Sequence, residues 1–254
     1  MQTYKTSGTD MDPSHKFRPL AALRAMRKLL KDREDTSQVF VITSSLRGKS
    51  ALRGAERLAR TATGRAVLDA KRSLLPVLCD RKRLAAMPLG SFGRAYFDFV
   101  SKENISADGL VEASQVQRKH AAVSADEQLF RERIRDMHDL WHVLTGYGRD
   151  PLGETCVVAF TYAQTRSTGL AVISLLGSIR ISRALPGSPV KAAVIEAFRH
   201  GRAAAWLPGE ELDKQLHEPL EGLRGRLRIA PPERYRTIIK ALATRETIPV
   251  AAAS

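Results

Sequence analysis

The chain has 254 residues, enough for one large domain that buries a sizeable core without disulfides. Its 41 Lys and Arg residues outnumber 27 Asp and Glu residues, and the net charge of +14 predicts attraction to nucleic acid, acidic lipid headgroups or an anionic substrate. No RNP aromatic motif and no paired Cys and His ligands accompany that charge, so we expect no nucleic-acid partner.

The chain's two cysteines and its apolar runs exclude several further classes. Cys79 and Cys156 lie too far apart for a cysteine zinc site or a secreted disulfide framework, and a reducing compartment fits best. No apolar run approaches the roughly 20 residues of a membrane-spanning helix. The polar first sixteen residues resemble neither a secretory signal nor a transit peptide. We expect a cytoplasmic bacterial protein.

The first predicted element is an amphipathic helix at 17–34. Apolar residues recur there at intervals of three and four, and the opposite face is basic. Two interpretations stay open, a helix packed on the core or a helix lying on anionic lipid. Residues 36–46 have β-branched character that allows a short strand, and 50–68 return to helical spacing, which predicts one or two helices.

The next helix has a clear start signal. Ser91 follows a Pro-Leu-Gly turn and is suited to cap a helix that runs to about Lys102. Residues 104–123 are polar and lack a sustained period, so we predict a surface connection there.

Two long helices, 125–145 and 151–177, form the predicted centre of the molecule. The short turn 146–149 joins them, Asp150 is a good N-cap, and Pro151 suits the first helical position. A helical hairpin is the consequence. Helices at 188–206 and 209–224 follow. The fold class is therefore all-α, a single helical domain at 17–243 with flexible ends at 1–16 and 244–254.

One cluster on this hairpin carries metal-binding chemistry. His138 and His142 are four residues apart, so their side chains differ by only about 40° around a helix axis and share a face. Asp139 lies at the edge of that face, and Arg135 projects toward it one turn earlier. Glu154 begins the second helix, and antiparallel packing would bring it level with His142.

We predict that His138, Asp139, His142 and Glu154 bind about one divalent ion per chain. Two neutral imidazoles and two carboxylates match the ligand preferences of Zn²⁺, and Fe²⁺ and Mn²⁺ are also admissible. Histidines pair on helices by chance, but the register of Glu154 argues against chance here. Arg135 would either bind a substrate carboxylate, as a catalytic residue beside the four ligands, or form a salt bridge with a neighbouring acid.

These residues also carry a family resemblance. His138-Asp139-Leu140-Trp141-His142, followed after eleven residues by Glu154, resembles the HDxxH-x11-E signature of the coenzyme Q biosynthesis protein 4 family. Leu152-Gly153-Glu154 resembles the family's Leu-Gly-Glu, and the segments 88–96 and 218–224 resemble its Pro-x-Gly-Ser/Thr-x-Gly-x-x-Tyr and Pro-Leu-x-x-Leu-Arg elements. The resemblance spans roughly residues 35–232.

The resemblance implies an all-helical zinc protein of ubiquinone biosynthesis. Its expected reaction is oxidative decarboxylation at ring carbon 1 of a polyprenylated 4-hydroxybenzoate, with a hydroxyl replacing the carboxyl. The alternative is a non-catalytic lipid-binding scaffold that organises other ubiquinone-biosynthesis enzymes. A generic zinc hydrolase is a third class, for which no nucleophile motif is present.

The expected setting is the inner membrane surface, where the protein would act as a peripheral homodimer. Residues 156–177 are apolar or small on nearly every face and must be buried by protein, lipid or both. Two interpretations are equally open, an ordinary core helix or a groove for the polyprenyl tail. In the second, a bulky residue at Ala163 or Gly169 would block the tail.

Overall fold

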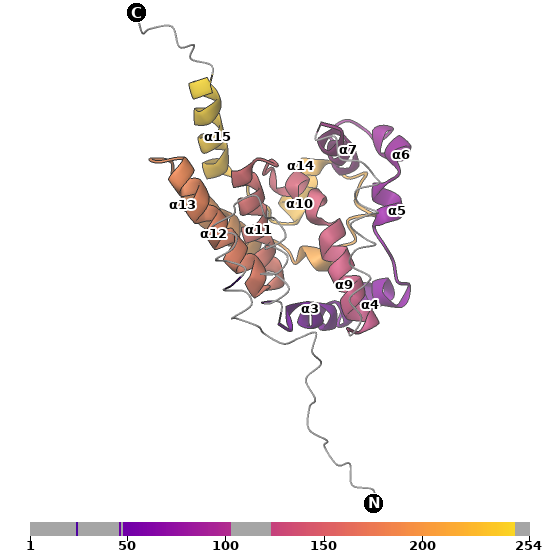
Figure 1. Cartoon of the computed structure of the whole chain (residues 1–254). Coiled ribbons are helices and arrows are strands. Elements are labelled where there is room, and N and C mark those ends of the chain that lie inside the picture. Colours follow the sequence, from indigo (N-terminus) through magenta and orange to yellow (C-terminus); the bar gives the residue numbers. More distant parts are fainter. Residues whose placement is uncertain (1–23, 25–45, 47, 103–122, 247–254) are drawn as a thin grey trace, which may run out of the picture.

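The computed structural model describes residues 24, 46, 48–102 and 123–246 (Figure 1). The regular structure of these residues is helical throughout, and their β-type pairing is confined to one isolated bridge between Ser91 and Pro219. The all-α prediction is confirmed. No helix in the described ranges has both the length and the apolar character needed to cross a bilayer. The predictions for 17–34, for 104–122 and for nearly all of 36–46 lie outside the described residues.

The N-terminal part of the described chain consists of short helices. α3 (Ser50–Ala59) and α4 (Ala62–Asp69) occupy the segment for which one or two helices were predicted. α5 (Leu75–Leu78) and α6 (Arg81–Ala85) connect them to α7 (Phe92–Lys102).

The predicted cap of α7 is confirmed. The hydroxyl of Ser91 accepts a hydrogen bond from the backbone N–H of Arg94 at 3.2 Å. The first turn of α7 is also tied to a distant segment, because the N–H groups of Phe92 and Gly93 donate to the carbonyls of Glu218 and Leu216. These bonds satisfy N–H groups that the start of a helix leaves without an intrahelical partner.

The predicted helix 125–145 is divided at Met137 into α9 (Ala125–Asp136) and α10 (His138–Thr145). The division is slight, since Met137 keeps right-handed helical angles (φ −76°, ψ −12°) and its N–H still bonds to Arg133. Ser124 caps α9 through the N–H of Glu127 at 3.2 Å.

The single helix predicted for 151–177 was wrong. The structure has α11 (Pro151–Thr165) and then α12 (Thr168–Ala184). Arg166 adopts the left-handed conformation (φ 57°) and ends α11, and the chain then reverses. Arg166 carries a Cβ that disfavours this conformation, so the sequence offers no glycine to signal the break. α12 packs against α11 so closely that a Cβ on Gly177 would lie 2.7 Å from the Thr155 hydroxyl oxygen.

The C-terminal part differs most from prediction. α13 (Val190–Ala203) lies within the predicted 188–206, but the predicted helix 209–224 is wrong, because an irregular stretch separates the 3-10 helix η2 (Leu207–Gly209) from the short α14 (Leu220–Arg226). α15 (Glu233–Glu246) was not predicted and extends past the expected end of the domain at 243.

The helices pack around a core in which α10 and α11 lie centrally. α11 contacts both α12 and α13, α13 contacts α15, α7 contacts α10, and α3 contacts α9 (Figure 1). Trp141 of α10 and Phe160 of α11 are completely buried and meet edge to face with ring centroids 6.0 Å apart. Truncating a large buried aromatic side chain lowers the free energy of unfolding by about 3–5 kcal/mol. This pair therefore contributes strongly to the packing of α10 against α11.

Candidate metal centre

α10 presents two histidines on one face, as the spacing predicts. The rings of His138 and His142 are stacked, with centroids 4.8 Å apart and planes inclined by 10°. The His142 ring also stacks against Phe99 of α7, with ring centroids 5.5 Å apart. The His142 side chain is completely buried, whereas 41% of the His138 side chain is exposed. The orientation of His142 is thus fixed by packing, whereas His138 lies at the solvent-exposed edge of the site.

The turn between α10 and α11 has a fixed shape. Gly146 ends α10 in the left-handed conformation (φ 74°), and the carboxylate of Asp150 accepts hydrogen bonds from the N–H groups of Leu152 and Gly153 at 3.1 Å each. These two caps confirm the predicted ends of the turn. Gly153 must be glycine here, because a Cβ on it would lie 2.0 Å from the carbonyl oxygen of Gly148.

Tyr235 of α15 braces the same turn from outside. Its hydroxyl donates to the Asp150 carboxylate and accepts from the N–H of Gly148 at 2.9 Å. Its ring meets that of Tyr147 edge to face at 5.4 Å. The C-terminal helix α15 therefore stabilises the turn between α10 and α11, which precedes Glu154.

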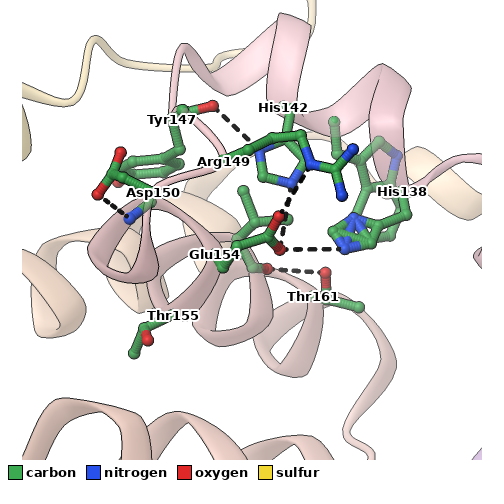
Figure 2. A network of polar contacts seen from close by, with 12 residues as sticks. His138, His142, Tyr147, Arg149, Asp150, Glu154, Thr155 and Thr161 are labelled. Carbon is green, nitrogen blue, oxygen red and sulfur yellow. Dashed lines mark hydrogen bonds and ion pairs between the residues drawn. The ribbon is translucent and has the colours of Figure 1, made fainter. Parts of the chain in front are cut away.

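Glu154, in the first turn of α11, completes a group of three (Figure 2). Its Oε2 lies 3.5 Å from Nε2 of His142 and 3.6 Å from Nε2 of His138, and the three ligand atoms all lie within 4.8 Å of one another. Ligands around a tetrahedral ion at about 2.0–2.1 Å are separated by about 3.3 Å. The group is therefore close to the spacing that one ion requires.

Hydrogen bonding at His142 aims one nitrogen at this group. Its Nδ1 lies 3.0 Å from the carbonyl oxygen of Tyr147, and a carbonyl can only accept, so Nδ1 carries the proton (Figure 2). In the neutral ring, Nε2 then offers a lone pair. That Nε2 atom is buried without a hydrogen bond. A metal-ligating histidine requires a ring nitrogen with a free lone pair that points toward the other ligand atoms. It also requires a fixed tautomer, which the backbone carbonyl of Tyr147 sets here.

The charges in the site support the same assignment. Burial alone would raise the pKa of Glu154, but the neighbouring His142, His138 and Arg149 side chains lower it below its ordinary value. The pKa of His138 is also lowered, first by burial of the ring and then by the neighbouring His142. These shifts favour an ionised carboxylate and an uncharged imidazole, which are the protonation states of metal ligands.

Two neutral imidazoles and one carboxylate fit a divalent ion. This set is found in catalytic zinc sites that keep an open fourth position, and it is also the set of Fe²⁺ oxygenase sites. The structure brings His138, His142 and Glu154 together within the described residues.

The other two predicted site residues lie outside this group. Asp139 follows His138 on α10, but its carboxylate is not among the three ligand groups that come within 4.8 Å of one another. Arg135 donates from Nε and Nη2 to Asp136 at 2.8 and 2.6 Å. For Arg135 the structure therefore has the salt bridge that was one of the two alternatives.

Sequence reasoning missed the residues that surround the ligands. Phe99, the Tyr147 carbonyl and Tyr235 come from other elements or from the backbone, so no local spacing could have placed them. Arg149 had been placed in the turn, but nothing in the sequence showed that its Nε would lie 3.4 Å from Oε1 of Glu154.

An apolar cleft opens between α11, α12 and α13. Its volume of about 470 Å³ lies in the range of small-molecule pockets. Its rim includes Leu175 and Ile195, which are 60% and 50% exposed. The lining comes from all three helices: Ala159, Tyr162, Ala171, Ser174, Leu175, Ser178, Ile179, Lys191, Val194, Ile195 and Phe198. Ala163 and Gly169 are buried but do not line it, so the predicted blocking positions lie elsewhere.

The chain is similar to named mitochondrial proteins. It is 28% identical over 200 residues to the Ubiquinone biosynthesis protein COQ4 homolog of Bos taurus, a match that covers 79% of this chain and 72% of the relative. The human homolog is 26% identical over the same shares of the two chains. The match to the rat homolog, at 27% identity, covers 61% of this chain and 57% of the relative, which is less than two thirds of its length.

A solved structure has the same fold. It is a crystal structure of a Nostoc punctiforme protein named for ubiquinone biosynthesis, and it superposes with a TM-score of 0.64 at 21% identity over 84% of this chain and 98% of that chain. The family described as Coenzyme Q (ubiquinone) biosynthesis protein Coq4 matches residues 18–233. That span is most of the molecule and includes the three-residue group. The chain therefore belongs to the Coq4 family of ubiquinone biosynthesis proteins.

Proposed function

We propose that this chain is a metal-dependent enzyme that replaces the carboxyl group at ring carbon 1 of a polyprenylated 4-hydroxybenzoate with a hydroxyl group. The observation that carries the proposal is the group formed by His138, His142 and Glu154, with the tautomer of His142 set by the Tyr147 carbonyl. Three protein ligands leave a position for substrate, whereas structural zinc sites are closed by four. The three-ligand group therefore favours an enzyme over a scaffold.

The protein's contribution would be to bind and orient. A divalent ion held there supplies Lewis-acid chemistry that stabilises negative charge on a phenolate or carboxylate oxygen, and Fe²⁺ would add redox capacity that zinc lacks. Glu154 would contribute Oε2 as a ligand, because that oxygen faces both imidazoles. The carboxyl would leave as carbon dioxide. One atom of molecular oxygen would become the new hydroxyl oxygen, and the other would be reduced to water with two electrons and two protons from an external reductant.

The apolar cleft would take the prenyl tail. Its lining is almost wholly hydrocarbon, and it lies beside α11, the helix that carries Glu154. Each buried CH₂ group contributes about 0.8 kcal/mol, so even a few isoprene units would add substantially to affinity. Ala163 is a poor position for testing the tail, because it packs beneath Gly201 in the contact between α11 and α13.

The experiment is a direct assay. Purified protein of measured metal content is incubated under ¹⁸O₂ with a prenylated 4-hydroxybenzoate and a two-electron reductant, and the product is analysed by mass spectrometry. We expect loss of the carboxyl group and gain of one labelled hydroxyl, with no product from chelated protein or from His142→Ala. If the metal-loaded protein binds the acid tightly but never converts it, the scaffold function replaces the catalytic one.

We also propose that the protein works as a homodimer at the cytoplasmic face of a bacterial inner membrane, next to other ubiquinone-biosynthesis enzymes. The net charge of +14 supports attraction to anionic headgroups. Flotation with anionic and with neutral vesicles tests the membrane contact, and light scattering after size-exclusion chromatography tests the dimer. Equal flotation with both kinds of vesicle would contradict the electrostatic part.

A further inference from the structure

We propose that Arg149 binds the carboxylate of the aromatic acid at the metal centre and so determines the preference of the site for acids. The identity of the acid rests on the proposed function. The role of Arg149 rests on the geometry of the turn between α10 and α11.

The two carboxylate oxygens of Glu154 have different neighbours. Nε of Arg149 lies 3.4 Å from Oε1, while Oε2 faces the nitrogens of His138 and His142 (Figure 2). Figure 2 shows the Arg149 side chain extending from the turn toward the three-residue group. The guanidinium therefore lies at the edge of the metal position and leaves Oε2 available to the metal.

The guanidinium of Arg149 also has N–H groups that are available to a ligand. Within the described part of the chain, its side chain forms a hydrogen bond from Nε to Glu154, and its terminal amino groups donate to no protein atom. The side chain is 38% exposed, so a ligand can reach it. The planar fork of a guanidinium suits a carboxylate, which accepts two parallel N–H bonds.

The charge balance of the site favours an anion. Glu154 and Asp139 each place a negative charge near His138. A divalent ion and Arg149 together still outweigh these two carboxylates, because the two imidazoles are neutral when they bind a metal. An anionic ligand at the open position would compensate this excess. Arg135 is less suited to that task, since two of its nitrogens already donate to Asp136.

The test compares a prenylated 4-hydroxybenzoate with the carboxamide of the same tail length. Binding to zinc-loaded protein is measured by calorimetry for the wild type, Arg149→Gln and Arg149→Lys. The matched control is Arg60→Gln, which removes one positive charge from an exposed position at the end of α3. We expect the wild type and the control to prefer the acid by about tenfold or more, which corresponds to about 1.4 kcal/mol.

Arg149→Gln should lose this preference with its zinc content unchanged, and Arg149→Lys should keep part of it, because an ammonium retains the charge without the fork. If Arg149→Gln keeps the full preference, or if the wild type binds acid and amide equally, the proposal is overturned. Loss of zinc from Arg149→Gln would overturn it as well, since the residue would then serve Glu154 alone. A preserved acid preference in protein that never turns the acid over would refute the proposed function and leave the role of Arg149 intact.

Discussion

Two faces of α11 differ in how they would recognise a ligand. Glu154 faces two histidines, and its surroundings are held by caps, a stacked ring and the Tyr235 brace. Ala159 lies roughly 7.5 Å further along the axis and about 140° around it, and it lines the apolar cleft, where shape and hydrocarbon dominate. The polar head of a ligand would thus be recognised by metal coordination and hydrogen bonds, and its tail by burial of apolar surface. The two sites would lie on different faces of α11.

The sharpest way to break this comparison is to remove a ligand from the polar face. His142→Ala should reduce bound metal from about one ion per chain to nearly none, because two ligands rarely retain a divalent ion. Elemental analysis after dialysis measures this. His217→Ala is the control, since His217 is an exposed histidine outside the group. Metal retained at full stoichiometry in His142→Ala would refute the assignment of the site.

A second prediction concerns the close approach that sets the hairpin turn. Gly153→Ala should destabilise the protein by about 2–4 kcal/mol, since its Cβ would lie 2.0 Å from the Gly148 carbonyl oxygen and backbone must move. Gly222→Ala meets no atom within 4 Å on α14 and should stabilise it slightly. Chemical denaturation measures both. Equal stability of the two variants would show that the turn is not constrained.

The third prediction addresses the apolar face. Ala171→Trp should fill part of the cleft and weaken binding of long-tailed ligands by about tenfold, while short-tailed ligands and metal content stay unchanged. Ala184→Trp, at an exposed position near the end of α12, is the matched control. If wild-type affinity does not rise with tail length, the cleft is not the tail site.

A smaller effect is expected from the brace on the turn. Tyr235→Phe removes the hydroxyl that donates to Asp150 and accepts from Gly148, and should cost about 1 kcal/mol of unfolding free energy. Metal affinity should fall by up to about tenfold, as for outer-shell partners of metal ligands. An unchanged affinity for zinc in a competition titration would show that Tyr235 of α15 does not contribute to metal binding.

The smallest effect is on the pH dependence of the metal-free protein. Burial and His142 lower the pKa of His138, so below its ordinary value of 6.5 the unfolded chain binds more protons than the folded one. Stability should therefore decrease as the pH falls below about 6.5. The lowered pKa of Glu154 adds a further loss below its ordinary value of 4.5. Thermal melts of chelated wild type and His138→Gln check this, and His138→Gln should show the shallower decline.

Local signals predicted the helix caps and the shared face of the two histidines, but they predicted the rest of the fold less well. Caps at Ser91 and Asp150 and the spacing of His138 and His142 act within one turn of helix, so the sequence shows them directly. The reversal at Arg166 depends on tertiary contacts that hold a non-glycine residue in the left-handed conformation.

Two further misses have the same origin in distant contacts. Residues 209–224 contain apolar side chains at helical intervals, yet the backbone carbonyls of Leu216 and Glu218 bond to the start of α7 instead of continuing a helix. Arg149 and Phe99 join the site from a turn and from another helix, and neither position is visible from sequence spacing.

The most direct test of the metal assignment is diffraction from zinc-soaked crystals at the zinc absorption edge. We predict one strong anomalous peak per chain, about 2.0–2.2 Å from Nε2 of His138, Nε2 of His142 and Oε2 of Glu154. A peak at another place, or no peak in protein that is shown to be folded, would contradict the account.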